Sequence, residues 1–334
     1  MTSTTTSKPP TDEALTGKPL TNELAGDPPR PPQMKFTVQP WSPEYGSPGG
    51  KEDLEAPEAV VDIEVDAAKW APIIVGAKPA DEVLFVDGVR RIDANLWIEE
   101  EDGTPMLALA ASYGAGAVLC NHSARIVAHE IRRGIFTSAA AATRIVTRHA
   151  NYDVHHTRGL IAEDLWLGLQ QRMGELEGMI VASHADAPLI VVDGPLSHHR
   201  HVPGAVGYVK TQHVHYLPPN LRPILGRLGP GDRTPLFLTT TSWSRFSWYL
   251  KLPLKDAGHM DGIVRAEVNA DQDVASARRI ADLTAATMCR YASAAHKDPR
   301  APQNLYPVGQ LERRLHHFLG DRELLYRSLR VAAA

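Results

Sequence analysis

Two short apolar segments that each end in Asp-Gly constrain this sequence more than any other feature. Residues 83–88 read VLFVDG and residues 189–194 read LIVVDG. An uninterrupted apolar run of this length is typical of a buried strand, so each segment predicts a strand that carries an aspartate at its end. A simple turn is the alternative at either site, because Asp and Gly both favour turns. Two such carboxylates on neighbouring strands would repel each other unless a divalent cation lay between them, so together they predict a metal site at Asp87 and Asp193.

Composition bounds the class of protein. The chain has 334 residues, is 43% hydrophobic and 22% charged, and has a formal net charge of −4. These values are typical of a soluble globular protein, and any contact with nucleic acid must come from a local basic patch. Cys120 and Cys289 lie outside any metal or redox spacing, which indicates a reducing compartment. No segment is apolar enough to span a bilayer and no signal peptide is recognisable, so we expect a cytoplasmic protein without a membrane partner.

The N-terminal segment differs from the rest of the chain. Ten of the 26 prolines lie within residues 1–50, with Thr, Ser and Gly among them. Such a segment buries too little apolar surface to offset the entropy lost on ordering. We therefore expect residues 1–50 to be largely disordered and residues 55–330 to form the folded domain.

The order of the remaining patterns favours an α/β domain. Three apolar runs, at 83–86, 94–98 and 106–120, predict three consecutive antiparallel strands. Helical patterns at 123–133 and 139–149 predict a helical insert around 123–160. A longer helix is expected over 159–183. Strand patterns recur at 189–192, 205–211, 234–240, 244–253 and 262–269, and helices are expected at 274–294 and in the C-terminal tail. This order predicts a mixed β-sheet flanked by helices.

A third acid would strengthen the metal site, because two-metal hydrolysis normally uses several carboxylates. The helix predicted over 159–183 supplies Glu175 and Glu177. Glu177 falls on the apolar face, four residues after Met173, and Glu175 lies further round the helix. The alternative is that both acids belong to a solvated helix end.

Basic and aromatic residues accompany these acids in the sequence. The candidates for DNA contact are Arg90, Arg91, Lys210, Arg245, Trp248 and Lys251. A basic group beside a metal can bind phosphate, and an aromatic ring can stack on an unpaired base. The alternative for 244–253 is an amphipathic strand whose aromatic residues belong to the core. Histidines cluster at 198–201 without a metal-binding spacing, and no GxSxG, P-loop, GxGxxG or HExxH motif is present.

The ordered set of motifs resembles the NurA nuclease family. It comprises FVDGVRR, a helical Glu, VVDGPL, GYVK, SWYLKL and PQNLYPVGQLERRLHHFLGD, and spans residues 81–330. The resemblance implies an RNase H-like core, a homodimer and a manganese-dependent (or magnesium-dependent) DNA nuclease. It also implies cooperation with a hexameric HerA-type ATPase in end resection at DNA double-strand breaks, and a nucleoid-associated location.

Carried over residue by residue, the resemblance implies Asp87, Asp193 and a helical Glu as metal ligands. That Glu is placed at Glu175, with Glu177 close behind. Lys210 is expected to contact the scissile phosphate, and Tyr306 and His316 are expected to complete the site. The long N-terminus and the insert between Asp87 and the helical Glu depart from the family.

Two other function classes compete with the nuclease. A non-catalytic RNase H-like adaptor would bind DNA or a translocating ATPase, with its acids used in salt bridges, for example Asp87 with Arg90 or Arg91. A metal-dependent phosphatase for small molecules would need a narrow pocket instead of an open groove. A nuclease requires Asp87 and Asp193 to lie at the same end of the sheet.

Overall fold

The computed structural model describes residues 59–211, 215–254 and 261–333, apart from the side chain of His198. The predicted disordered segment, residues 1–50, lies outside these ranges. None of the helices within them is both long enough and apolar enough to cross a bilayer.

In the described part of the chain, ten strands form one mixed sheet in the order β4-β5-β3-β2-β1-β6-β7-β10-β9-β8. The strands are β1 (Val83–Glu99), β2 (Pro105–Cys120), β3 (Ala124–Thr137), β4 (Ile145–Val146), β5 (Asn151–His156), β6 (Ile190–Asp193), β7 (Ala205–Val209), β8 (Phe237–Thr240), β9 (Ser244–Lys251) and β10 (Ile263–Asn269). The helices are α1 (Ala162–Ala182), α2 (Val274–Met288), α3 (Tyr306–Phe318) and α4 (Arg322–Ala332), with short 3₁₀ turns η1 (Ala67–Lys69), η2 (Leu196–His198) and η3 (Arg222–Arg227).

The centre of the sheet has the topology of an RNase H-like core, as predicted. Strands β1, β2 and β3 form an antiparallel meander, α1 follows, and β6 returns parallel to β1 with β7 parallel to β6. The crossover through α1 is what allows β6 to lie beside β1 in the same direction. The predicted α/β class with a mixed sheet flanked by helices is confirmed.

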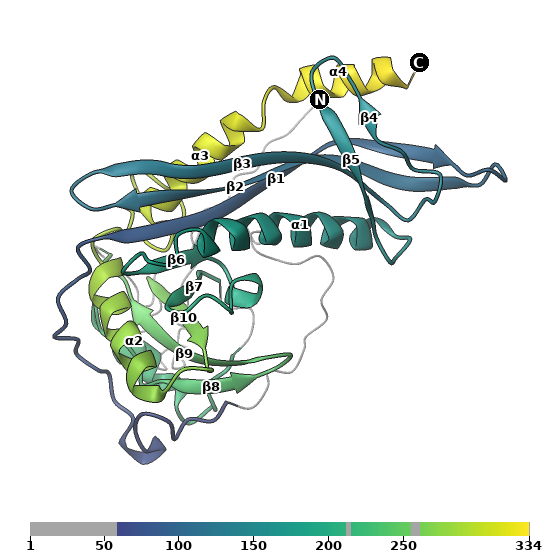
Figure 1. The fold of residues 1–334 in the computed structure, drawn as a ribbon. Coiled ribbons are helices and arrows are strands. Elements are labelled where there is room, and N and C mark those ends of the chain that lie inside the picture. Colours follow the sequence, from purple (N-terminus) through teal and green to yellow (C-terminus); the bar gives the residue numbers. More distant parts are fainter. Residues whose placement is uncertain (1–58, 212–214, 255–260, 334) are drawn as a thin grey trace, which may run out of the picture. The chain divides into compact units, whose positions relative to one another are not determined.

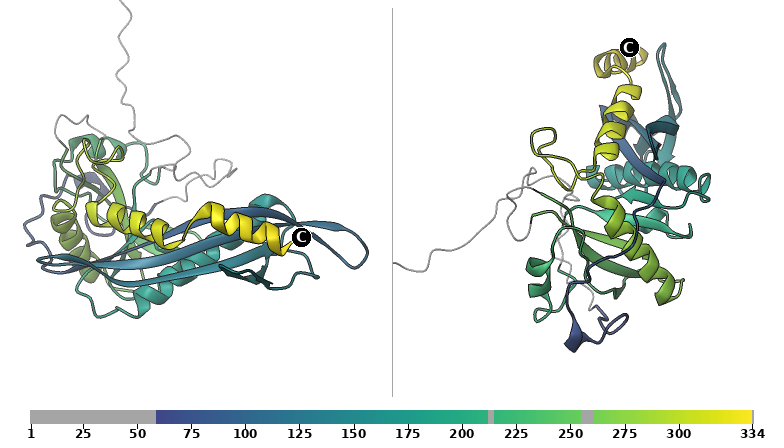
Figure 2. Two further views of the ribbon diagram at one scale, coloured as in Figure 1. Left: turned by 90° about the horizontal axis from the view of Figure 1, so that it is seen from above. Right: turned by 90° about the vertical axis from the view of Figure 1, so that its left-hand side faces the viewer.

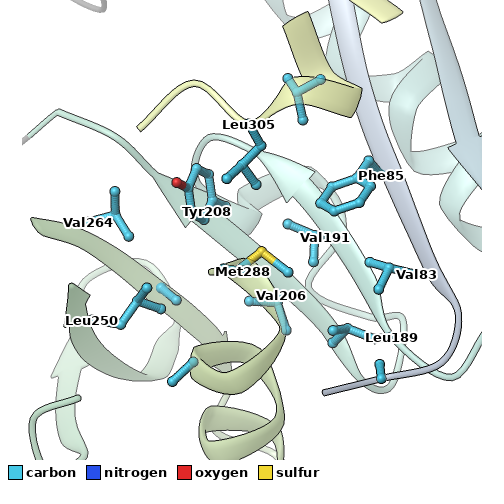
Figure 3. Packing of buried hydrophobic residues seen from close by; sticks show 14 of the residues in the cluster. Val83, Phe85, Leu189, Val191, Val206, Tyr208, Leu250, Val264, Met288 and Leu305 are labelled. Atoms are coloured by element: carbon cyan, nitrogen blue, oxygen red, sulfur yellow. The ribbon is translucent and has the colours of Figure 1, made fainter. Parts of the chain in front are cut away.

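Helices cover both faces of this core (Figure 1). Side chains alternate along β1, so Leu84 and Val86 pack with α1, whereas Phe85 and Val89 pack with α2 and α3. Figure 2 shows α3 and α4 following each other along the long strands. Figure 3 shows the α2 and α3 side of the core, where Phe85 and Val191 from neighbouring strands lie near Leu305.

The predicted helical insert around 123–160 is wrong, because strands β3, β4 and β5 occupy that range. Strand β3 pairs with β2 along its whole length, and its β-branched residues Ile126, Val127, Ile131 and Ile135 favour an extended backbone. One face of this strand stays partly exposed, so its polar residues recur at spacings that imitate an amphipathic helix.

The predicted break between strands at 83–86 and 94–98 is also absent. Strand β1 runs through Asp87, Gly88 and both arginines to Glu99, paired with β2. The irregularity is a bulge at Asp93, whose buried carboxylate accepts hydrogen bonds from Ser112 Oγ at 2.5 Å, Arg91 Nε at 2.9 Å and Tyr152 Oη at 3.0 Å. A bulge with its own polar partners lets one long strand continue where the sequence pattern suggested a turn.

Replacing this buried acceptor should destabilise the fold. We expect Asp93→Ala to lower the free energy of unfolding by about 3–5 kcal/mol, because it leaves half-buried Arg91 and two buried hydroxyls without their acceptor. Urea denaturation measures the change. Asp153→Ala is the matched control, since Asp153 is exposed and pairs only with exposed Arg144, so a loss below about 1 kcal/mol is expected. Equal losses in the two variants would contradict the role of Asp93.

Candidate active site

Asp87 and Asp193 lie side by side on one face of the sheet. Val86 of β1 is in register with Val192 of β6, so the two aspartates that follow occupy adjacent positions on parallel strands. Both share the face of Phe85 and Val191, toward α2 and α3. Strand β6 ends at Asp193 and the chain turns at Gly194, which has a φ of 101°, while β1 continues. The two carboxylates therefore lie beside each other on adjacent strands, although Asp87 lies within β1 and not at its end as the sequence predicted.

Asp87 is held in an environment that opposes its charge. Its exposed fraction is 7%, and its carboxylate Oδ1 accepts a hydrogen bond from the backbone N–H of Gly88 at 2.8 Å. Burial first, and then the charge of Asp193, raise the pKa of Asp87 well above its usual value; Lys210 opposes this shift, and Glu177 and Glu312 add to it. Among the described residues, no Lys, Arg or His lies within ion-pair distance of Asp87. The adaptor's expected pairing of Asp87 with Arg90 or Arg91 is therefore not found.

Asp193 differs because it has a cation. Lys210 Nζ donates to Asp193 Oδ2 at 2.6 Å and to Asn304 Oδ1 at 2.8 Å. Asn304 Nδ2 in turn donates to Asp298 Oδ2 at 2.7 Å. Lys210 thus lies beside Asp193, and its contact with a scissile phosphate stays a prediction; Asn304 and Asp298 were not among the predicted residues. The signal for Asn304 lay in the PQNLYP motif, but nothing in the sequence indicated its contact with Lys210.

The structure brings Glu177, and not Glu175, toward the aspartates. Glu177 is buried, and its Oε1 atom lies against Gly88, where an added Cβ would collide with it and approach Met173 Cγ to 2.9 Å. Glu175 points to the exposed side of α1, where it accepts hydrogen bonds from Arg172 at 2.8 Å and Gln171 at 3.1 Å. The preference for Glu175 is therefore corrected. The apolar periodicity of α1 already distinguished the two residues, because only Glu177 shares the face of Met173 and Ile180.

His199 lies next to Glu177. Its Nε2 atom is 3.3 Å from Glu177 Oε2, and its exposed fraction is 2%. A hollow of about 550 Å³ opens beside this pair, between the C-terminal half of α1 and the loop that follows η2. The histidine cluster at 198–201 was noted in the sequence, but its position against α1 depends on the fold of the loop after Asp193.

The two arginines after Asp87 have separate environments. Arg90 lies on the α1 face, with its guanidinium 4.5 Å from the ring centroid of Trp166. Burial lowers the pKa of Arg90, and the charges of Glu177 and Asp87 oppose this shift. Arg91 lies on the other face, where it binds Asp93 and the carbonyl oxygen of Gly320 at 2.9 Å. Arg91 therefore connects β1 to the segment that follows α3.

The predicted basic and aromatic surface on β9 is largely buried. Trp248 is fully buried in the core, so no base can stack on it. Arg245, 7% exposed, lies 3.2 Å from Glu267 and stacks over Trp243. Lys251, at the end of β9, is half-buried. The alternative in which these aromatic residues belong to an amphipathic strand is the one the structure supports.

The late residues Tyr306 and His316 do not contact either aspartate. Tyr306 begins α3, and its hydroxyl accepts a hydrogen bond from the backbone N–H of Ala294 at 3.2 Å. His316 is exposed near the end of α3. Glu312 of α3, one turn before His316, adds to the raised pKa of Asp87. The Glu312 carboxylate pairs with Arg300 at 2.7 Å. No pattern in the sequence singled out Glu312.

These side chains form a pair of carboxylates with a third nearby, not a closed cage. In residues 59–211, 215–254 and 261–333, no group of three His, Cys, Asp or Glu side chains is arranged to hold a metal ion. Asp87 of β1 and Asp193 of β6 lie on one face of the sheet, whereas Glu177 of α1 approaches Gly88 from the opposite face. Magnesium is often bound in this way, by one or two carboxylates with water and substrate phosphate completing its shell.

Comparison with known proteins gives a structural similarity without a match in sequence. No family model matches the sequence, and no curated protein matches it. Among solved structures, the NurA nuclease from Sulfolobus solfataricus is similar over 77% of this chain and 85% of its own, with a TM-score of 0.44 and 11% sequence identity.

Proposed function

We propose that this protein is a divalent-metal-dependent DNA nuclease that hydrolyses phosphodiester bonds. The observation that carries the proposal is the pairing of Asp87 and Asp193 on one face of adjacent parallel strands, with Asp87 buried and unpaired by any described cation. Burial, and then the like charge of Asp193, raise the pKa of Asp87, so a charged Asp87 is costly for the fold alone. Such perturbation is common where carboxylates serve chemistry.

The donor set fits Mn²⁺ or Mg²⁺. Asp87 and Asp193 would hold the ion, because both supply the hard oxygen ligands that these cations prefer, and Glu177 is the nearest further carboxylate. When bound, such an ion lowers the pKa of a water and polarises a phosphate oxygen. Lys210 donates to the Oδ2 atom of Asp193, and the Oδ1 atom would bind the ion.

The chain's own residues orient the site and bind the strand. Asn304 fixes the ammonium of Lys210 beside Asp193, so that a positive charge lies where a phosphate would approach. Gly88 leaves the space through which Glu177 approaches β1. Arg90, supported by Trp166, is the remaining cation beside Glu177 and a candidate for binding the DNA backbone.

The motif order supports a wider proposal. The resemblance of FVDGVRR, VVDGPL and the PQNLYP tail to NurA nucleases favours action in end resection at double-strand breaks. In this role the protein would act as a homodimer with a HerA-type hexameric ATPase, on DNA in the cytoplasmic nucleoid. The Asp193–Lys210 ion pair is the observation that favours the second candidate, a non-catalytic RNase H-like adaptor.

Cleavage of DNA distinguishes the two candidates. We expect the protein to cut labelled linear DNA with Mn²⁺ or Mg²⁺ and not with EDTA, and Asp87→Asn to reduce the rate by about 100-fold or more, because the variant removes a charged ligand from the proposed metal site. Gel analysis of single- and double-stranded substrates measures this. An uncleaved substrate under all metal conditions would favour the adaptor.

The same variant should stabilise the metal-free protein. Because the pKa of Asp87 is raised in the fold, the unfolded chain loses this proton first, and stability falls as pH rises above about 4, the usual pKa of Asp. We therefore expect Asp87→Asn to raise the free energy of unfolding at pH 7 in EDTA by about 1–3 kcal/mol, a gain that disappears toward pH 4.

Thermal unfolding with and without Mn²⁺ completes this test. A bound cation should raise the melting temperature of the wild-type protein and leave that of Asp87→Asn nearly unchanged. A melting temperature lower for Asp87→Asn than for the wild-type protein, in EDTA at pH 7, would mean that the charged carboxylate of Asp87 stabilises the fold.

The two helical acids provide a matched pair. We expect Glu177→Gln to reduce metal-dependent cleavage by about tenfold or more, since Glu177 lies against Gly88 and acts on the charge of Asp87. Glu175→Gln should stay within about twofold of wild type, because Glu175 is exposed and paired with Arg172. Single-turnover cleavage rates measure both, and the reverse ranking would return the role to Glu175.

A further inference from the structure

A small cavity lies at the start of α3, on the side of the network that holds Asp193. Its volume is about 250 Å³, and it is lined by Lys297, Asp298, Tyr306, Gly309, Gln310 and Arg313. The mechanism proposed above uses none of these side chains directly. A cavity of this size accommodates a tetrahedral anion with some water.

The balance of charge in the cavity is positive. Lys297 and Arg313 are exposed, and in the described part of the chain neither has a carboxylate within ion-pair distance. Asp298 is already satisfied: although burial acts to raise its pKa, hydrogen bonds from the Arg300 backbone and from Asn304, with the charge of Arg300, lower it. Lys297 and Arg313 therefore outnumber Asp298, whose charge is already met by Arg300, and the lining of the cavity keeps a net positive charge.

The remaining polar groups suit an anion. The ammonium of Lys297 lies 5.4 Å from the ring centroid of Tyr306, which keeps it near the cavity. The Tyr306 hydroxyl accepts from Ala294, so its own proton is left to donate. No residue of the first turn of α3 is itself acidic, so the helix dipole adds positive potential there, which the carboxylate of Asp298 near Gly309 reduces.

Hydrogen bonds connect this cavity to the proposed active site. Asp298 in the cavity wall holds Asn304, Asn304 holds Lys210, and Lys210 holds Asp193. Gly309 is required for this packing, because a Cβ there would lie 2.9 Å from Asn304 Nδ2. The cavity and the aspartates are therefore placed at a fixed separation by one buried network.

We propose that this cavity is a phosphate-binding subsite that holds a second phosphate of the DNA strand whose scissile phosphodiester lies at Asp87 and Asp193. This proposal rests on the proposed nuclease function. It adds a second contact with the DNA strand, which would determine which phosphodiester lies at Asp87 and Asp193. Arg313 and Lys297 bind the phosphate oxygens, with Tyr306 and Gln310 as neutral donors. The phosphate is either internal to the strand or at its end.

Binding without cleavage tests the subsite. Full-length protein in EDTA is titrated with a labelled single-stranded oligonucleotide at several salt concentrations, by fluorescence anisotropy. The double variant Lys297→Gln/Arg313→Gln is compared with Arg314→Gln, an exposed arginine of the same helix that lies over Phe318 outside the cavity. We expect the double variant to bind about tenfold more weakly and its salt slope to fall by about 0.7, as for one lost phosphate contact.

Two further arms identify the source of the phosphate. Inorganic phosphate should compete with the oligonucleotide for wild-type protein and lose this effect in the double variant. An equal loss of affinity for 5′-phosphorylated and 5′-hydroxyl oligonucleotides indicates an internal phosphate, and a loss confined to the former indicates a terminal one; both support the subsite. An unchanged salt slope in the double variant, or an equal decrease in Arg314→Gln, overturns it. Cleavage by the wild-type protein is scored separately, so a failed nuclease is distinguishable from a failed subsite.

Discussion

Repulsion between two neighbouring carboxylates is the constraint around which this part of the molecule is arranged. Asp87 and Asp193 occupy adjacent positions on parallel strands, and the protein neutralises only one of them, through Lys210. A fold selected for stability alone would pair both acids or replace them. Leaving Asp87 buried and unpaired keeps a strong preference for an added positive charge at this position, which is the property that a cation-binding site requires.

The surroundings of this pair depend on where the pairing between β1 and β6 ends. Strand β6 ends at Asp193 while β1 continues, so the backbone at Gly88 loses a neighbour on one side and Glu177 approaches it from α1. The absence of a side chain at Gly88 is essential, since even a methyl group would collide with the glutamate carboxylate. Glu177 consequently acts on Asp87 from the opposite face of the sheet, and within the described residues these acids do not form a group of three arranged to hold a metal ion.

Local patterns predicted the parts of this site that depend on one strand or one helix. The apolar runs before Asp87 and Asp193 correctly indicated buried strands, and the apolar stripe of α1 distinguished Glu177 from Glu175. Contacts between distant segments could not be predicted in this way. Asn304 and Glu312 are conspicuous only once α3 packs beside β1, and Trp248 could be excluded as a DNA contact only once its face of β9 was known. The helix predicted near 123–133 failed because a half-exposed strand with a bulge does not keep a strict alternation.

The network from Asp193 to Asp298 links the stability of the site to its geometry. Each member satisfies its neighbour: Lys210 is held by two oxygens, Asn304 uses its oxygen for Lys210 and its nitrogen for Asp298, and Asp298 receives Arg300 as well. A buried chain of this kind tolerates little change at any position, because an amide that bridges a cation and an acid cannot reverse without losing both bonds. Rigidity at Lys210 and an unsatisfied charge at Asp87 are therefore complementary. In the proposed nuclease, the first would fix the position of a phosphate, and the second would attract the cation that accompanies it.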